Sequence, residues 1–379
     1  MLLSAGRVVT PARVFAPGWL QVEGEQVVDV GPGVPPTPPD VELPAATVVP
    51  GFIDVHVHGG GGASFDTGTP EAAATVVRAH LMHGTTTMVA SLVTDAPERL
   101  LTQVGELGAL VDDGLLAGLH LEGPWLSPRH AGAHEPGLLT QPTPGQVDDL
   151  VGAARGQLRM VTLAPELDGG LDAVRRLVTA GVTVALGHTD ATYDVARAAL
   201  DAGATVGTHL FNAMRQLHHR EPGPVAALLE HPDTYVELIA DGVHLHPAVL
   251  RLAALAKPHL AVLVTDAMAA AALPAEGGDY QLGPMTVQVR EGVARLADTG
   301  AIAGSTLTMA VAVKYAVRVA GLPIEEVVRA ATASPAAMLG LERVGALRPG
   351  FHADLVVLDE ELDVSRVMRQ GRWVATRPR

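Results

Sequence analysis

The sequence predicts an α/β protein: a (β/α)8 TIM-type barrel with a small β-sandwich domain built from both termini. Eight apolar runs of strand length, beginning at residue 48, alternate with Ala-rich and Leu-rich segments that have helical spacing. The runs are continuously apolar, which is typical of parallel strands covered by helices. Both ends of the chain instead carry short, turn-punctuated strand patterns without helices between them.

The expected barrel elements follow one another in order along the chain. The eight strands are expected at residues 48–56, 85–93, 115–121, 158–164, 182–187, 205–208, 235–240 and 260–265. Helices are expected between them at residues 70–83, 96–111, 171–180, 192–202, 224–231 and 247–256. Closure of such strands into a barrel would bring all their carboxyl ends to one face.

The flanking segments differ from the barrel in character. Residues 2–31 and 353–375 show strand patterns, and the proline-rich stretch VPPTPPD at 34–40 predicts a stiff connection. The expected domains are therefore a β-sandwich of residues 1–49 and 345–379 and a barrel of residues 50–344.

Composition excludes several classes of protein. The formal net charge is −15 and no Lys-rich or Arg-rich run interrupts the acidic balance, so a broad nucleic-acid surface has no electrostatic basis. The chain has no cysteine, which leaves His, Asp and Glu as the plausible metal ligands. No window holds the ~18 uncharged apolar residues of a membrane helix, and no secretion signal is recognisable. We expect a cytoplasmic protein with no membrane partner.

Two histidines at the end of the first expected strand point to a metal site. His56 and His58 are one residue apart, so their side chains share one face of the strand, and four glycines at 59–62 follow at once. We interpret this glycine run as a loop free of side chains beside the metal. Taken alone, such a pair is about as often a hydrogen-bonded pair of surface or core histidines as a ligand pair.

Other ligand-type residues follow later strands. They are Glu122 after the third strand, His188 after the fifth, His209 after the sixth, His244 after the seventh and Asp266 after the eighth. Each also has a structural interpretation: Glu122 could cap a loop, His188 could be a core histidine and Asp266 could begin a helix. Because strand ends are few and these residue types occupy most of them, we favour a common site at the barrel rim.

The collected donors indicate a particular chemistry. Four neutral imidazoles and a bridging carboxylate suit one or two divalent ions; we expect Zn first, and Fe, Mn or Co remain open. Such an ion lowers the pKa of a bound water from about 15.7 toward about 7, giving a hydroxide nucleophile without serine or cysteine. Asp266 is then the candidate general base, and afterwards the acid that protonates a leaving amine. The sequence thus predicts metal-assisted amide hydrolysis.

A series of motifs gives the chain a family resemblance. In order they are PGFIDVHVHGGGG (50–62), LHLEGPWLSPRHAGAHEPG (119–137), LAPE (163–166), GHTDATYD (187–194), THLFNAM (208–214), REPG (220–223), ADGVH (240–244), VTDAM (264–268) and AGSTLTM (303–309). Together they resemble the N-acetylglucosamine-6-phosphate deacetylases of the amidohydrolase superfamily. The resemblance spans nearly the whole chain.

This resemblance implies roles for individual residues. Glu122, His188 and His209 match the metal ligands of the family, and Asp266 matches its acid/base aspartate. His134 is expected to donate a hydrogen bond to the amide oxygen. The positions expected to contact the substrate are Ala133, His134, Asn212, Ala213, Arg220, His244, Ile302, Ala303 and Gly304.

Two further expectations concern the assembly and the second metal. The arginine matched by Arg220 can reach across a dimer interface in the family, so a homodimer is expected; its structural alternative is a surface ion pair with Glu221. Some members lack the first histidine of the pair and use one metal. Because this chain has both His56 and His58, we expect a second ion, at least partly occupied, with Glu122 as the bridge.

The resulting hypothesis is a metal-dependent hydrolase that converts N-acetylglucosamine 6-phosphate to glucosamine 6-phosphate and acetate. Its expected partner is thus a small sugar phosphate. One alternative is an amidohydrolase for another acetylated sugar phosphate, such as the galactosamine epimer, or for a cyclic amide. Another is a sugar-phosphate sensor without catalytic activity, which would have no need of Asp266 as an acid or base.

Overall fold

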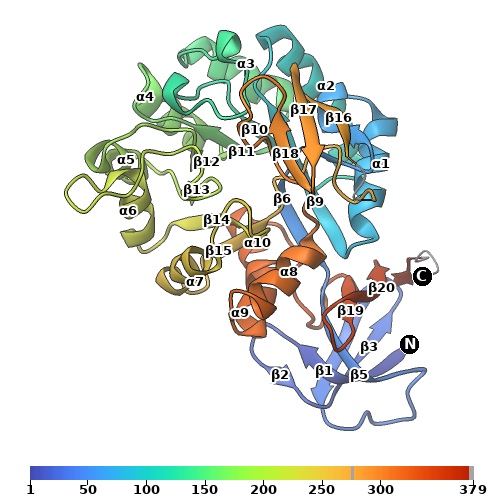
Figure 1. The fold of residues 1–379 in the computed structure, drawn as a ribbon. Coiled ribbons are helices and arrows are strands. Elements are labelled where there is room, and N and C mark those ends of the chain that lie inside the picture. The colour runs from blue at the N-terminus through green and yellow to red at the C-terminus, as the bar shows by residue number, and fades with distance from the viewer. Residues whose placement is uncertain (275–276, 375–379) are drawn as a thin grey trace.

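The computed structural model describes residues 1–274 and 277–374. Its central feature is a sheet of eight parallel strands that are hydrogen-bonded in chain order. The strands are β6 (Phe52–Val57), β9 (Thr85–Val93), β10 (Gly118–Glu122), β11 (Leu158–Leu163), β12 (Thr183–Leu186), β13 (Val206–Gly207), β14 (Tyr235–Ile239) and β15 (Ala261–Val264). A parallel bridge between Val57 and Ala267 links the two ends of the sheet, and helices surround it (Figure 1). The predicted (β/α)8 barrel is confirmed.

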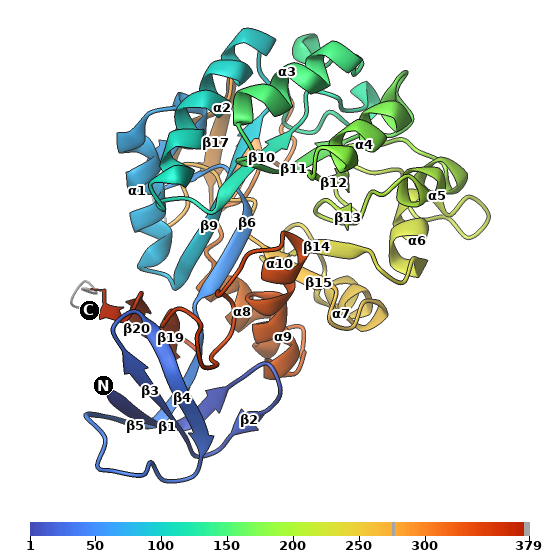
Figure 2. The same ribbon diagram turned by 180° about the vertical axis from the view of Figure 1, so that it is seen from behind.

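Helices cover the outside of the barrel (Figure 2). They are α1 (Pro70–Leu81), α2 (Pro97–Asp112), α3 (Pro144–Ala154), α4 (Gly170–Thr179), α5 (Tyr193–Asp201), α6 (Gly223–Glu230), α7 (Pro247–Ala256), α8 (Met309–Arg318), α9 (Ile324–Ala330) and α10 (Ala333–Met338). Short 3-10 turns are η1 (Phe65–Thr67), η2 (Pro128–His130) and η3 (Pro136–Leu138). The local sequence determines where α3 begins, because the Thr143 side chain caps this helix and forms a capping box with Gln146. Among the described residues, no helix combines the length and apolarity needed to cross a bilayer.

The first expected strand, at residues 48–56, is wrong as a single element. Residues up to Pro50 belong to β5 (Val41–Pro50), which pairs with the C-terminal strand β19 (Leu355–Leu358), whereas β6 starts at Phe52. The change of sheet occurs at Gly51, where an added Cβ would lie 2.1 Å from the Thr86 hydroxyl oxygen. The apolar run continues across this break because both sheets bury their strands.

Strands from both termini form a separate sheet below the barrel, as predicted (Figure 1). Besides β5 and β19 it contains β1 (Leu2–Val9), β2 (Val14–Phe15), β3 (Gly18–Glu23), β4 (Gln26–Pro32), β20 (Val364–Arg369) and β21 (Arg372–Trp373). The hydrogen bonding is continuous through all eight strands, and a bridge between Gln26 and His352 closes the sheet around its own apolar core. The last predicted residues of this domain, 375–379, lie outside the described residues.

A three-stranded antiparallel sheet between β15 and α8 was not expected. Its strands are β16 (Gly278–Leu282), β17 (Met285–Arg290) and β18 (Val293–Leu296). Its apolar side packs with Val93, Met268 and Ala303 at the carboxyl end of the barrel. This insert therefore forms one wall above the barrel rim.

The glycine run after β6 forms a small hairpin, β7 (Gly59–Gly60) paired with β8 (Ala63–Ser64). Gly61 and Gly62 at its turn have φ values of 63° and 89°, which favour glycine. At Gly60 an added Cβ would lie 2.5 Å from His80 Nε2. The absence of side chains here allows close packing under the rim.

Candidate metal centre and active site

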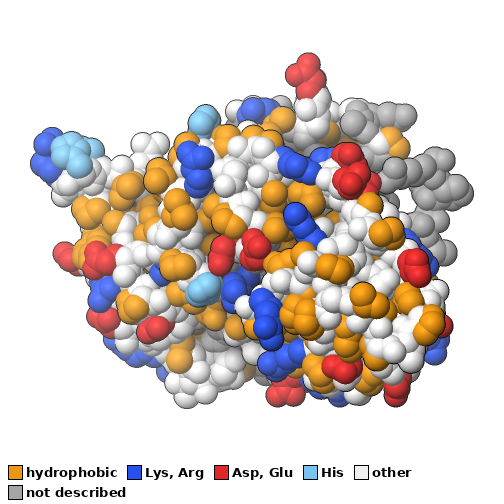
Figure 3. Space-filling model, turned by 90° about the horizontal axis from the view of Figure 1, so that it is seen from below, with side chains coloured by type: hydrophobic (Ala, Val, Ile, Leu, Met, Phe, Trp, Pro, Cys, Tyr) orange, Lys and Arg blue, Asp and Glu red, His pale blue; other side chains and the backbone are white. Residues whose placement is uncertain are grey.

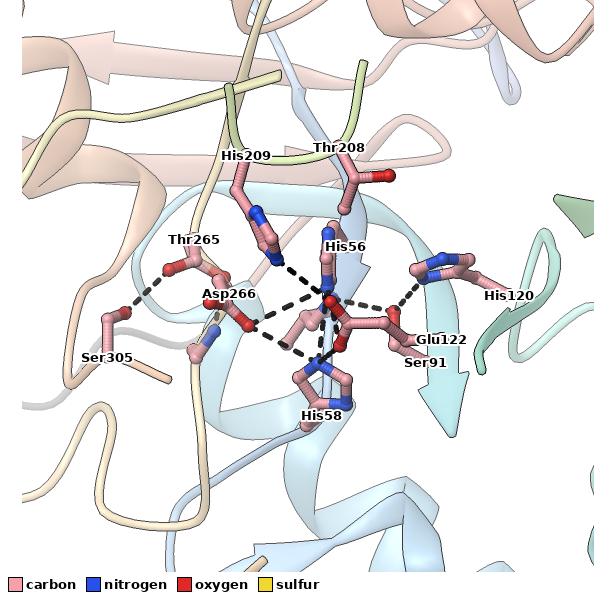
Figure 4. A network of polar contacts seen from close by, with 12 residues as sticks. His56, His58, Ser91, His120, Glu122, Thr208, His209, Thr265, Asp266 and Ser305 are labelled. Carbon is pink, nitrogen blue, oxygen red and sulfur yellow. Dashed lines mark hydrogen bonds and ion pairs between the residues drawn. The ribbon is translucent and has the colours of Figure 1, made fainter. Parts of the chain in front are cut away.

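The barrel gathers six predicted side chains at the carboxyl ends of its strands. They are His56, His58, Glu122, His188, His209 and Asp266, and all six are buried. Figure 4 shows Glu122, His209 and Asp266 converging from separate segments on His56 and His58, which share the end of β6. Three of the six, His188, His209 and Asp266, have positive φ values of 47°, 27° and 49°. Such strained backbone is typical of functional sites, because a side chain is held there in a position that regular structure would not give.

Glu122 lies between two pairs of imidazoles. Its Oε1 atom is 2.9 Å from His209 Nε2 and 3.0 Å from His188 Nε2. Its Oε2 atom is 3.2 Å from His58 Nε2 and 3.4 Å from His56 Nε2. Each carboxylate oxygen thus faces one pair, which is the geometry of a bridging ligand.

Asp266 belongs to the half of the cluster that contains His56 and His58. Its Oδ1 atom is 3.3 Å from His58 Nε2 and 3.6 Å from His56 Nε2. The preceding residue, Thr265, fixes this part of the backbone by donating its hydroxyl hydrogen to Asp54 at 2.5 Å. The carboxylate is therefore held at the rim, next to the cluster.

The hydrogen bonds behind the rings show that the cluster fits a cation. His188 Nδ1 donates to the carbonyl oxygen of His130 at 2.7 Å, so the neutral ring directs the Nε2 lone pair at Glu122. His56 Nδ1 lies 3.0 Å from the carboxylate of Glu237, so its Nε2 lone pair also points into the cluster. The Nε2 lone pairs of His188 and His56 then face the lone pairs of the Glu122 oxygens at 3.0 and 3.4 Å, with no proton between them. A divalent ion placed between these atoms would bind both the nitrogens and the oxygens.

Electrostatics favour positive charge at the same place. Burial alone would lower the pKa of His56, but Glu122 and Glu237 raise that pKa well above its ordinary value. Burial likewise opposes protonation of His58, and hydrogen bonds with Asp266 and Glu122 raise its pKa to about 9. Burial would raise the pKa of Glu122, yet the neighbouring histidines hold it well below its usual range. A divalent cation would satisfy the carboxylates that otherwise attract protons.

His134 is arranged in the opposite way from the ligand histidines. The backbone N–H of Thr94 donates to His134 Nδ1 at 3.3 Å, which leaves the ring proton on Nε2. Nε2 lies 3.6 Å from Glu122 Oε2, at the edge of the cluster. Burial lowers the pKa of His134 to about 4, so the ring is neutral and offers an N–H donor.

A cavity of about 320 Å³ opens above the cluster. Seven of the predicted substrate positions line it: Ala133, His134, Asn212, Ala213, His244, Ile302 and Gly304. Ala303 is buried in the core of the β16–β18 insert. His244 Nδ1 lies 2.6 Å from Asp241, and this contact outweighs burial and raises the pKa of His244. The ring is thus held as a donor at the cavity wall.

Arg220 is not among the residues that line the cavity. It is exposed on the loop between β13 and α6, where its guanidinium lies 2.8 Å from His219 Nε2. This loop extends from the barrel in Figure 1, and Figure 3 shows basic and His side chains at the tip of a projection on the same side. Within one chain, Arg220 is therefore separated from the cluster.

The structure adds cavity residues that the sequence reasoning missed. Arg129, His130, Val93 and Leu282 also line the cavity. Arg129 donates to Asp190 at 2.9 Å, and hydrogen bonds from Arg215 hold the pKa of Asp190 well below its usual range, against the effect of burial. Arg129 is the one Lys or Arg among the described lining residues. Its place in LSPRHAGAH, between Glu122 and His134, was a signal that could have identified it.

The comparisons with known proteins agree with this site. A model of the Amidohydrolase family matches residues 47–374. An N-acetylgalactosamine-6-phosphate deacetylase of Escherichia coli O157:H7 is 39% identical over 94% of this chain and 95% of its own length. An N-acetylglucosamine-6-phosphate deacetylase of Vibrio furnissii is 37% identical over 89% of this chain and 86% of its own length.

A solved structure is similar over the full fold. It is a mutant of N-acetyl-D-glucosamine-6-phosphate deacetylase from Mycobacterium smegmatis in complex with N-acetyl-D-glucosamine-6-phosphate. It has a TM-score of 0.97 and 51% sequence identity, and the match covers 99% of both chains. These similarities confirm the resemblance inferred from the motifs, and the chain belongs to the amidohydrolase family of hydrolases.

Proposed function

We propose that the protein removes the acetyl group from N-acetylglucosamine 6-phosphate and releases glucosamine 6-phosphate and acetate. The observation that carries this proposal is the position of Glu122 between two imidazole pairs, with Asp266 3.3 Å from His58 at the foot of a cavity. An acid/base carboxylate beside a cation site is what amide hydrolysis requires and what a sugar-phosphate sensor does not.

Five residues would hold the metal. Glu122, His188 and His209 would bind one ion, and His56, His58 and the second oxygen of Glu122 would bind another. When bound, such an ion polarises the amide carbonyl and lowers the pKa of water. The donor set of nitrogen and oxygen suits Zn, with Fe, Mn or Co as alternatives.

Asp266 and His134 would move or donate the protons of the reaction. Burial opposes the charge on Asp266, but His58 and His56 lower its pKa to about 2, so it is a carboxylate at neutral pH and able to accept a proton at Oδ1. It would then pass this proton to the departing amine. The Nε2–H of His134 would donate to the amide oxygen as negative charge develops there.

Recognition of the phosphate would involve a second copy of the chain. His244 and Asn212 lie on the cavity wall, whereas Arg220 lies on a projecting loop outside it. A homodimer in which Arg220 reaches the partner's cavity would combine them, and a guanidinium fork suits a phosphate. A cytoplasmic location is part of the same proposal, because sugar phosphates are metabolised in the cytoplasm.

The galactosamine epimer is the second candidate substrate. The relative from Escherichia coli O157:H7 that is 39% identical carries the name N-acetylgalactosamine-6-phosphate deacetylase. The two substrates differ only in the configuration of one hydroxyl, which the residue types of the cavity do not discriminate.

Acetate release from the purified protein tests the proposal. The assay compares both phosphorylated epimers with unphosphorylated N-acetylglucosamine, and metal is quantified in the same sample. We expect release from the phosphorylated glucosamine derivative, much weaker release without the phosphate, and one to two metal equivalents per chain. Metal-loaded protein that releases no acetate from either phosphorylated epimer would contradict the proposal.

A further inference from the structure

Glu237 is a buried carboxylate to which neither the sequence motifs nor the proposed reaction gives a role. It lies on β14 with no exposed surface, inside the barrel and below the metal cluster. Burying a carboxylate is unfavourable unless its oxygens are paired, so its partners indicate why it is there.

Those partners come from both halves of the cluster. Glu237 Oε2 lies 3.0 Å from His56 Nδ1 and accepts the backbone N–H of His209 at 3.2 Å. Its other oxygen, Oε1, is buried and has no hydrogen-bond partner among the described residues. Within the described part of the chain, His56 is therefore the only side chain that donates to this carboxylate.

The four imidazoles of the cluster differ in the hydrogen-bond partner of the Nδ1 atom, the ring nitrogen that points away from Glu122. The Nδ1 atoms of His58 and His209 are buried without a hydrogen-bond partner in the described residues. His188 donates from Nδ1 to a neutral carbonyl oxygen. Of the four, only His56 donates from Nδ1 to a carboxylate. This hydrogen bond fixes the tautomer of the ring, and the negative charge of the carboxylate makes Nε2 a more basic ligand.

We propose that Glu237 is a positioning residue that holds His56 as an Nε2 ligand and thereby sets the affinity of the His56–His58 ion. This inference rests on the proposed binuclear centre. At His209 the carboxylate contacts only the backbone N–H, so loss of the charge leaves the His209 imidazole facing Glu122. Removal of the charge should therefore weaken one ion selectively.

The test is a metal titration of Glu237→Gln in competition with a chromophoric chelator, using Zn²⁺ alone and the metal-free full chain. An amide oxygen still accepts from His56, so shape is kept while charge is lost. We expect one of two ions to bind ~10- to 100-fold more weakly, and the other to bind as in the wild type. Circular dichroism verifies the fold.

Asp66→Asn is a matched control. Asp66 is also a buried carboxylate, and one of its oxygens has no partner in residues 1–274 and 277–374; its other oxygen accepts from Ser64 and Gly283, away from the cluster. This variant should bind both ions normally. If Glu237→Gln does not fold, Glu237→Asp keeps the charge but withdraws it from His56, and the same selective weakening is expected.

A double-mutant cycle separates positioning from a general structural effect. In a His56→Asn background, Glu237→Gln should cause no further loss of metal affinity, because its effect acts through that ring. Unchanged affinity in Glu237→Gln, equal weakening of both ions, or a wild type that binds a single ion at saturation would each overturn the inference. The acetate assay is independent of this titration, so failure of the proposed function is recognised separately.

Discussion

Glu122 Oε1 lies 2.9 Å from His209 Nε2, although 87 positions separate the two residues in the chain. The contact exists because β10 and β13 end at the same rim of the barrel. The second oxygen of Glu122 faces His58 at 3.2 Å, so one carboxylate connects two groups of donors. Because the two groups of donors share only Glu122, metal binding to each group can be measured separately by substituting the histidines of one group.

Replacement of both His56 and His58 by Asn should cost one metal equivalent per chain. The ion held by Glu122, His188 and His209 should remain, since its three donors are untouched. Metal analysis of the purified variant measures the stoichiometry. His120→Gln serves as a control for altered packing, because the His120 ring packs edge-on against His56 with centroids 4.6 Å apart, yet its nitrogens bond Ser91 and Thr162 and offer no ligand atom to the cluster. Unchanged metal content in the double variant would refute a binuclear centre.

Asp266→Asn should lower turnover by ~10² or more while metal content and substrate affinity stay near those of the wild type. The amide keeps the shape of the side chain but cannot accept the proton. Steady-state kinetics with metal analysis of the same preparation give both quantities. Wild-type turnover in a fully metal-loaded variant would count decisively against Asp266 as the base.

Arg220 should act on the cavity of the partner chain. Arg220→Ala alone should raise KM for the phosphorylated substrate, and Asp266→Asn alone should abolish most turnover. At a substrate concentration well below the raised KM, where sites that lack Arg220 are nearly silent, coexpression of the two variants should restore about a quarter of wild-type activity, because half of a random mixture is heterodimer and each heterodimer has one intact site. Acetate release by the coexpressed mixture, compared with each variant alone, measures this.

Complementation would be absent if Arg220 served its own chain or only the surface. Arg129→Ala gives a useful comparison, because Arg129 lines the cavity of its own chain. Any effect of that variant should not be complemented by Asp266→Asn: one site of the heterodimer lacks Arg129 and the other lacks Asp266.

The positions that could be predicted are those fixed by periodicity and strand order. His56 and His58 share a face because side chains alternate along a strand, and Glu122, His188 and His209 meet because parallel strands end on one rim. Their residue types reveal the chemistry even though the distances between them do not follow from the sequence.

The positions that could not be predicted depend on packing between distant segments. Glu237 appears within an apolar strand, and nothing local indicates that His56 lies above it. The break at Gly51 is hidden because two buried strands follow one another directly. The β16–β18 insert carries alternating polar and apolar residues, a strand signal that the search for continuously apolar runs missed.

His80 gives a prediction for stability at low pH. It is fully buried, and its Nε2 donates to the carbonyl oxygen of Gly59 at 2.9 Å. Burial lowers its pKa from 6.5 to about 4 in the folded protein. The unfolded chain therefore binds a proton between these values that the folded chain does not, so stability falls as the pH drops from 6.5 toward 4.

His80→Gln should remove this loss, because an amide can donate the same hydrogen bond and does not titrate. Between pH 7 and pH 5 the metal-free wild type should lose about 2 kcal/mol more of its free energy of unfolding than the metal-free variant. Urea unfolding of both proteins at the two pH values measures the difference, and removing the metal prevents acid release of ions from contributing. An equal fall in the free energy of unfolding of the two proteins between pH 7 and pH 5 would contradict the prediction, because it would show that His80 takes up its proton in the folded state as readily as in the unfolded chain.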